Sequence, residues 1–353
     1  MKKNYLKITA GVMSSAMLIG LCAAGVPAKV IAATEHWNDA SASATQWNQW
    51  KNNWNTYSSN YEHVSLTPGA DQTQLNLAWY SHTTETPAVR IATKQNMDGA
   101  KEFVGTQTEA VTIDGVKYFS NKATVKGLKE NTKYYYQVFQ NGKWQDAETY
   151  TTKSFDSFSF LYVGDPQIGA SKNQTSTEQE KMVSAGNEVS SAAKDNLAAR
   201  NDGYNWNNIL NDAVKDHEDV SFIVSAGDQV NAGKNEREYA AYLGADALAS
   251  LPVATTIGNH DSVSNQYTLH FNNPNAFSDK DANYIQGKTE AGTDYYYRYG
   301  NTLFMVLDTN NYNCATHENV MKKAISGNKD AKWRIVVFHQ DIYGSGYDHS
   351  DSD

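Results

Sequence analysis

Residue types that bind divalent metal ions recur at four points of the chain, each time after a predicted β-strand. They are Asp165, Asp228, the tetrapeptide Gly-Asn-His-Asp that contains Asn259 and His260, and His339. Carboxylate, imidazole and amide oxygen all serve as ligands of such ions in proteins. Two ions held about 3.5–4 Å apart can activate a water molecule and clamp a phosphoryl group. The series therefore predicts a catalytic site with two metal ions.

The elements that must position these residues alternate between strands and helices. Short apolar, β-rich runs begin at Phe158, Val220, Leu251 and Trp333, and each leads to one of the candidate ligands. Helical patterns are expected between them, at about residues 206–217, 236–248 and 317–326. This alternation predicts a sheet with helices on its faces. Ligands of such sheets collect outside the carboxyl ends of the strands, where all four candidates fall.

Glycine precedes three of the candidate ligands and is expected to let the backbone turn sharply there. The resulting blocks are Gly164-Asp165, Gly227-Asp228, Gly258-Asn259-His260-Asp261 and Val337-Phe338-His339. Together they resemble the calcineurin-like metallophosphoesterase superfamily, and the preceding domain makes the chain similar to bacterial purple-acid-phosphatase-like proteins. The resemblance covers roughly residues 60–353. It implies an α/β metallophosphoesterase sandwich domain, incomplete at the C-terminus.

The resemblance also implies a role for each residue. Asp228 would bridge the two metal ions, Asp165 would bind the first ion, and Asn259 and His339 would bind the second. His260 would contact the phosphate oxygens and could protonate the leaving group. A metal-activated hydroxide would attack phosphorus, and iron, zinc and manganese all suit these ligands.

The chain departs from the family pattern in three ways. Many members carry histidine where this chain has Gln167, whose amide oxygen would be a weaker ligand of the first metal. Purple acid phosphatases place a tyrosine where this chain has Asn231, so we expect a colourless or pale protein. The family's final Gly-His-x-His block does not occur in the sequence. We therefore expect a truncated reading frame or a fragment, or else a site short of two ligands.

Several other polar residues lie near the blocks or between them. Asp261 is expected to support the site or the local fold, and Asp308 either orients a ligand or forms a turn. His217, His270, His317 and His349 match no family position and are interpreted as surface or helix-cap residues. The polar segment 173–203 is either a lid or a solvated insertion.

The N-terminus reads as a secretory signal peptide over residues 1–33, with a membrane anchor as the alternative. Three lysines precede a mostly apolar stretch at 8–26, and Ala32 and Ala33 suit cleavage.

Cleavage would change the charge and cysteine content of the chain. Removal of the four lysines of the signal peptide would lower the net charge from −9 to −13, which disfavours nucleic acid as a general partner. Only Cys314 would remain, so no internal disulfide can form. We expect a secreted protein of a Gram-positive bacterium, with cell-wall association as one option.

Two further segments precede the catalytic domain, which we place at residues 155–353. Residues 34–59 are rich in tryptophan, and Trp47, Trp50 and Trp54 form a helical stripe that favours packing over sugar binding. Residues 60–154 predict an all-β, fibronectin type III-like sandwich of the kind that precedes purple acid phosphatase catalytic domains. The turn signal Asn141-Gly142 and a tyrosine-corner pattern around Tyr134 support this prediction.

The sequence thus predicts a secreted phosphoesterase that depends on two metal ions and acts on phosphate esters, with phosphomonoesters favoured. A phosphodiesterase or nucleotidase of the same fold is the first alternative. A non-catalytic cell-surface binding protein with a degenerate site is the second. No stable membrane insertion is expected after signal cleavage, and the oligomeric state stays open.

Overall fold

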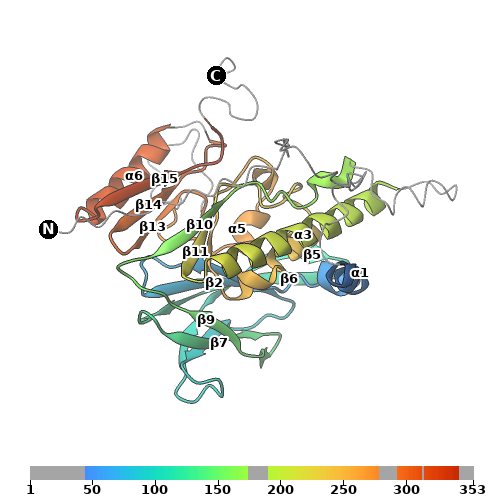
Figure 1. Ribbon diagram of the computed structural model, residues 1–353, viewed down its shortest axis with the longest axis horizontal. Helices are drawn as coiled ribbons and strands as arrows, with labels where there is room; N and C mark the ends of the chain where they lie inside the picture. Colours follow the sequence, from blue (N-terminus) through green and yellow to red (C-terminus); the bar gives the residue numbers. More distant parts are fainter. Residues whose placement is uncertain (1–43, 174–189, 278–291, 312–313, 342–353) are drawn as a thin grey trace, which may run out of the picture.

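The computed structural model describes residues 44–173, 190–277, 292–311 and 314–341. Within them the chain forms an N-terminal β domain and a larger α/β domain, against which helix α1 (Ala44–Ser58) packs (Figure 1). The predicted signal peptide and His349 lie outside the described residues. Among the described helices, none combines enough length and apolarity to cross a membrane.

The N-terminal domain consists of two antiparallel sheets, with strand orders β1-β2-β6-β5 and β4-β3-β7-β8, and β9 also pairs with β7. The strands are β1 (Ser65–Pro68), β2 (Gln74–Ser81), β3 (Ala88–Ala92), β4 (Lys101–Val104), β5 (Thr106–Ile113), β6 (Val116–Lys126), β7 (Lys133–Gln140), β8 (Lys143–Trp144) and β9 (Glu148–Thr151). Alternate residues of the central strands, among them Leu77 and Trp79 of β2 and Tyr136 and Val138 of β7, form the core between the sheets. The all-β fold predicted from this alternation is confirmed.

Two local signals of the β domain have the expected geometry. Asn141 and Gly142 both adopt a left-handed backbone, with φ of 54° and 77°, and join β7 to β8 as a tight hairpin. The hydroxyl of Tyr134 accepts a hydrogen bond from Lys129 N at 2.8 Å, which is the contact that defines a tyrosine corner.

The α/β domain is a sandwich of two three-stranded sheets. Strands β10 (Ser159–Val163), β11 (Val220–Ser225) and β12 (Val253–Ala254) are parallel and form the first sheet. The second contains β13 (Tyr295–Tyr299), β14 (Thr302–Val306) and β15 (Trp333–Val337), with β14 antiparallel to β13 and parallel to β15. The strands expected to form a sheet with helices on its faces are divided between two sheets, because β15, which precedes His339, belongs to the second. The sandwich implied by the family resemblance is confirmed.

Aromatic side chains fill the space between the two sheets. Phe222 of β11 stacks on Phe160 of β10, with ring centroids 5.6 Å apart, and meets Phe304 of β14 edge-on at 5.5 Å. Phe304 in turn stacks on Tyr297 of β13 at 4.8 Å. Such pairs stabilise the core beyond the apolar area they bury.

Helices cover the outer faces of both sheets (Figure 1). Helices α3 (Ser191–Asp216) and α4 (Glu236–Leu243) pack on the first sheet, and α6 (Cys314–Gly327) packs on the second. Helix α3 begins 15 residues before the predicted start at 206, because Ser190 caps its N-terminus and accepts a hydrogen bond from Ala193 N. The part of the polar segment from 190 onward is therefore helix, and not a lid or a solvated insertion. Helix α4 ends before Gly244 and is followed by the short helix η2 (Asp246–Ala249).

The tryptophan stripe of α1 packs against the α/β domain. Trp50 and Trp54 are buried, and their indole nitrogens donate to Arg200 O at 2.8 Å and to Asn196 Oδ1 at 2.9 Å. Gly203 of α3 makes room for both neighbouring helices, since a Cβ there would lie 3.4 Å from Cζ2 of Trp50 in α1 and 3.0 Å from the Cβ of Ala241 in α4. The packing interpretation of the stripe is confirmed for these two tryptophans.

Candidate metal centre

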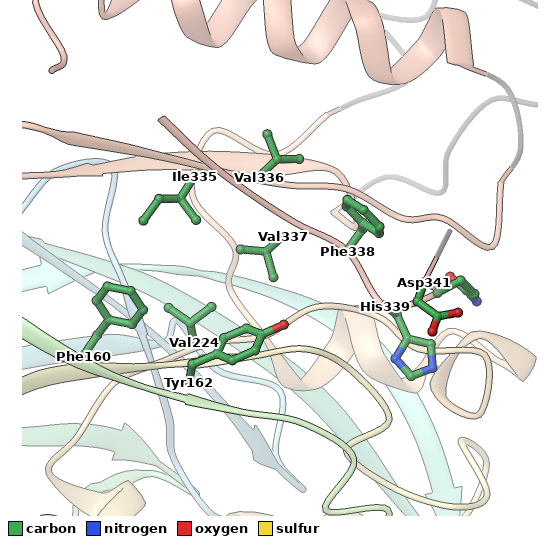
Figure 2. Close-up of a pocket in the computed structure, with 10 residues that line it drawn as sticks. Phe160, Tyr162, Val224, Ile335, Val336, Val337, Phe338, His339 and Asp341 are labelled. Carbon is green, nitrogen blue, oxygen red and sulfur yellow. The ribbon is translucent and has the colours of Figure 1, made fainter. Parts of the chain in front are cut away.

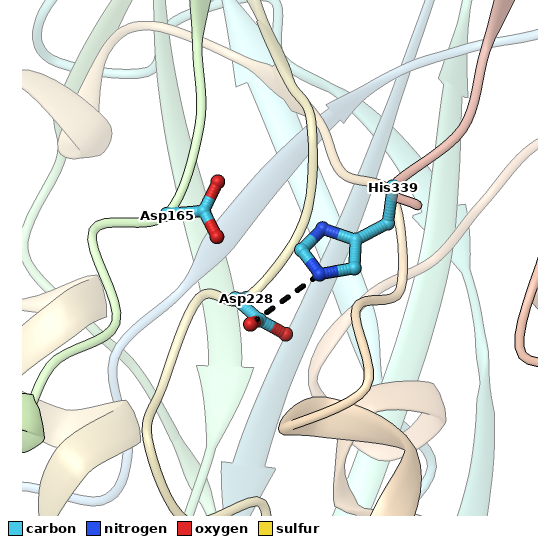
Figure 3. Close-up of side chains that lie close together, drawn as sticks. All are labelled: Asp165, Asp228 and His339. Atoms are coloured by element: carbon cyan, nitrogen blue, oxygen red, sulfur yellow. Dashed lines mark ion pairs between the residues drawn. The ribbon is translucent and has the colours of Figure 1, made fainter. Parts of the chain in front are cut away.

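Asp165, Asp228 and His339 come together where three strands end (Figure 3). One potential ligand atom from each side chain lies within 4.8 Å of the other two. Asp165 follows β10, Asp228 follows β11, and His339 follows β15, so both sheets of the sandwich contribute. The first two loops are also joined directly, because Asp165 N donates to Gly227 O at 3.1 Å.

The backbone is unusual at three of the predicted site residues. Asp165, Gln167 and Asp228 have φ values of 50°, 39° and 49°. Non-glycine residues seldom adopt this left-handed conformation, and each instance costs on the order of 1–3 kcal/mol. Backbone strain of this kind accumulates at binding and catalytic sites, where the surrounding fold maintains it.

The three glycines that precede the ligands serve different purposes. Gly227 has a φ of 119°, and a Cβ there would lie 2.5 Å from Nδ1 of His339. At Gly258 the φ is ordinary, but a Cβ would lie 1.9 Å from Oδ1 of Asp228. Gly164 shows neither feature, since its φ is ordinary and a Cβ would meet only Ala226, at 3.2 Å. A sharp turn explains Gly227 alone, whereas Gly258 allows the tetrapeptide loop to approach Asp228.

His339 contacts the loop that carries Asp228 and the loop that carries Asn259. Its Nδ1 lies 3.0 Å from Ala226 O, its Nε2 3.0 Å from Asn259 Oδ1, and the same Nε2 3.4 Å from Asp228 Oδ2. Although burial alone lowers the pKa of His339, the hydrogen bond and charge of Asp228, the Ala226 carbonyl and the charge of Asp165 together raise it to about 9. Because a carbonyl only accepts, Nδ1 carries a hydrogen in either protonation state, and a metal ion would bind Nε2 in place of its proton.

His260 lies beside this cluster and is held at three atoms. Its backbone N donates to Asp228 Oδ1 at 2.9 Å, and its Nδ1 donates to Asn231 O at 2.6 Å. Its Nε2 lies 3.0 Å from Nε2 of Gln167. With Nδ1–H bound to a carbonyl, a neutral His260 presents a lone pair at Nε2, to which the Gln167 amide donates. The nitrogen of Gln167 therefore supports His260, while Gln167 Oε1 stays the atom that could reach a metal ion.

Asp261 holds the tetrapeptide loop to the loop after Asp228. Its buried carboxylate accepts hydrogen bonds from Gly258 N at 2.9 Å, Gln229 N at 3.1 Å and Val230 N at 3.4 Å. Burial raises the pKa of this carboxyl to about 7. Asp261 thus has the supporting role that the sequence predicted.

The remaining histidines differ in part from expectation. His217 caps the C-terminus of α3, as predicted. His270 and His317 are buried, and each pairs with a carboxylate at 2.7 Å, Glu236 and Asp294 respectively, so a surface position is wrong for both. The partners lie on other elements, and the sequence around either histidine gives no sign of them. Asp308 forms a turn, since its Oδ1 accepts from Asn310 N at 3.0 Å.

A groove of about 440 Å³ runs from the cluster along the gap between β10 and β15 (Figure 2). Phe160 and Val224 line it from the first sheet, Val337 from the second, and His339 and Asp341 lie at its polar end. In the part of the chain that the structure describes, β10 pairs only with β11 and β15 only with β14.

The chemistry of the clustered side chains fits a metal ion. Two carboxylates and an imidazole converge, one carboxylate is buried, and an amide oxygen lies within hydrogen-bonding distance of the imidazole. Hard oxygen donors combined with one imidazole suit manganese, iron or zinc. Asp165, Asp228, Asn259 and His339 are thus brought together, and Gln167 and His260 lie next to them.

Comparison with known proteins relates both domains to described families. The family model of the purple acid phosphatase N-terminal domain matches residues 61–152, and that of calcineurin-like phosphoesterases matches residues 158–353. Among solved structures, purple acid phosphatase PPD1 from yellow lupin (Lupinus luteus) seeds is similar, with a TM-score of 0.54 and 14% identity over 81% of this chain. A PhoD structure has a TM-score of 0.39 and 12% identity over 71% of this chain.

The likeness to the lupin enzyme is one of fold at this level of identity. The chain spans about half of each solved structure, 52% in both cases. No curated protein matches the chain.

Proposed function

Because the chain belongs to the calcineurin-like phosphoesterase family, we propose that it is a secreted hydrolase of phosphate esters with a dinuclear metal centre. Phosphomonoesters are the proposed substrates, and iron, zinc or manganese the proposed metals. The observation that carries the proposal is the convergence of Asp165, Asp228 and His339 within 4.8 Å, at the ends of strands from both sheets.

Each side chain has a proposed task in holding the metals. Asp228, which is buried between the other two groups, would bridge both ions, and Asp165 would bind the first with help from Gln167 Oε1. Asn259 Oδ1 and His339 Nε2, which lie 3.0 Å apart, would bind the second. Bound ions supply positive charge that stabilises the charge developing on the phosphoryl oxygens.

His260 is the proposed proton donor. Its ring is oriented by the Asn231 carbonyl at Nδ1, so Nε2 is the atom that would contact the ester. For His260 to donate a proton from Nε2, the ring must carry a hydrogen on both nitrogens, and the Gln167 amide must release Nε2 or rotate to present its oxygen. The chain is acidic, with a net charge of −9, so attraction of a phosphate must come from the centre itself.

Hydrolysis of p-nitrophenyl phosphate by the full chain, with each candidate metal added, tests the proposal. We expect hydrolysis that is lost in Asp228→Asn and His260→Ala and retained in Asp98→Asn, a change at an exposed carboxylate paired with Lys94. Faster cleavage of the monoester than of bis-p-nitrophenyl phosphate would support a phosphomonoesterase. The reverse order would favour a phosphodiesterase or nucleotidase.

A binding protein without turnover is the second candidate, and the environment of Gln167 favours it. The amide is a weak metal ligand, and its nitrogen already faces His260 at 3.0 Å. Metal uptake that depends on Asp228, with no hydrolysis of either substrate, would support this function over the first.

A further inference from the structure

The loop between β14 and α6 joins the two segments that carry Asn259 and His339. Asn310, in this loop, donates from Nδ2 to Gly258 O at 3.3 Å, directly before Asn259. Its Oδ1 accepts from Gln340 Nε2 at 2.8 Å, directly after His339. One amide side chain therefore bonds to the neighbours of both residues.

The loop is held rigidly enough to act as a support. The carboxylate of Asp308 accepts from Asn310 N at 3.0 Å and from Asn310 Nδ2 at 2.9 Å, which fixes the orientation of the amide. Asp308 N donates to the buried Asp294 at 2.6 Å. His317 of α6 contacts Asp294 at 2.7 Å and Asn311 O at 2.7 Å, and thereby ties the loop to the helix.

A second contact strengthens the link to the β15 side. Gln340 N donates to Thr309 Oγ1 at 3.3 Å, and Thr309 Oγ1 donates to Gln340 Oε1. Both ends of the Gln340 amide are therefore bound by consecutive residues of one loop. Asn259 follows β12 in the first sheet and His339 follows β15 in the second, so relative movement of the two sheets would change their separation.

The chemistry of position 310 calls for an amide. The side chain must donate to a carbonyl and accept from an N–H at the same time, and it must fit a short loop. Aspartate lacks the donor, and an apolar residue lacks both groups.

We propose that Asn310 is a positioning residue of the metal centre, which sets the separation and orientation of Asn259 and His339. The proposal rests on the proposed function in one respect, namely that these two residues hold a metal ion. Partners that orient metal ligands in this way typically contribute about 10–100-fold to metal affinity.

Calorimetric titration of the metal-free full chain with Mn²⁺, and separately with Zn²⁺, tests the proposal. We expect Asn310→Ala to weaken binding of the ion held by Asn259 and His339 about 10–100-fold. Gln340→Ala removes only the link to the His339 side and should weaken binding of this ion less. In the double variant the loss should be smaller than the product of the two single losses, because both changes remove one shared hydrogen bond.

Asn328→Ala is the matched control, since Asn328 Nδ2 also donates to a backbone carbonyl, Ala324 O at 2.9 Å, but at the far end of α6. Its metal affinity should equal that of the wild type. The thermal unfolding midpoint of each metal-free variant shows whether it is folded, and if Asn310→Ala does not fold, Gln340→Ala decides the outcome.

Two failures are distinguishable. If Asn310→Ala and Gln340→Ala bind both ions as tightly as Asn328→Ala while Asp228→Asn has lost binding, the positioning role is overturned and the proposed function stands. If the wild type binds neither ion, or Asp228→Asn binds them equally well, the proposed function fails and the positioning role falls with it.

Discussion

The imidazole Nε2 of His339 lies 3.4 Å from the carboxylate of Asp228, although the two residues follow strands of different sheets. The contact links the ends of the two sheets and places a positive charge against the buried carboxylate when His339 is protonated. A cluster that raises the pKa of a histidine to about 9 also favours a metal cation in the same place.

Substitution of Gly258 by alanine should displace Asp228. The new Cβ would lie 1.9 Å from Asp228 Oδ1, so either the loop or the carboxylate must move. Overpacking of this kind costs about 1–3 kcal/mol of unfolding free energy, and we expect metal uptake to fall as well. Urea unfolding and metal analysis of the variant measure the two effects.

Gly327→Ala is the control for that substitution. A Cβ at this exposed helix end meets nothing within 4 Å, so metal uptake should be unchanged, while the lower entropy of the unfolded chain should raise stability by about 0.4–1 kcal/mol. Wild-type metal uptake by Gly258→Ala would show that the close approach to Asp228 is unimportant for the centre.

Loss of the His260 side chain should reduce turnover while leaving the metals bound. A positioned proton donor contributes about 10²–10⁴-fold to rate, and His260→Ala should lose a factor in this range. Steady-state hydrolysis of p-nitrophenyl phosphate gives the rate, and metal analysis of the same sample gives the occupancy. His82→Ala, a change at an exposed histidine of the β domain, should retain full activity. A variant that loses metal and activity together would instead make His260 part of the metal shell.

Glu238 should make the folded protein less stable as pH rises. Burial raises the pKa of this carboxyl from 4.5 to about 7, while backbone N–H of Ala232 and the Asn235 amide oppose the shift. The folded state therefore binds the proton more tightly than the unfolded state, and the associated stability is present below about 4.5 and lost as pH rises towards 7. The difference in unfolding free energy between the wild type and Glu238→Gln, measured from pH 4.5 to 8, isolates this effect. A difference that does not vary with pH would contradict it.

The sequence predicts the position of the candidate ligands well because strand ends are local features. Apolar runs followed by Gly-Asp or by the tetrapeptide place Asp165, Asp228 and Asn259 at one edge without knowledge of the fold. The division of the strands between two sheets is not local, and the alternation of strands and helices does not indicate it. Only the family resemblance indicated a sandwich.

Polar pairs between residues far apart in the chain are the second feature that the sequence does not predict. His270 and His317 are predicted to be surface or helix-cap residues, since the carboxylates that pair with them lie 34 and 23 residues away in the sequence. Nothing in the sequence marks Asn310 either, because its partners precede one ligand and follow another. The start of α3, by contrast, has a local signal in the sequence. Ser190 precedes an alanine-rich stretch, which is typical of a helix N-cap.

Metal content of the full chain is the most direct test of the proposed dinuclear centre. Wild type and Asp228→Asn would be loaded with the same metal, passed through gel filtration and analysed by inductively coupled plasma mass spectrometry, with Asp98→Asn as control. We expect about two ions per chain in the wild type and the control, as a dinuclear centre requires, and one or none in Asp228→Asn. Equal metal content in all three proteins would contradict it.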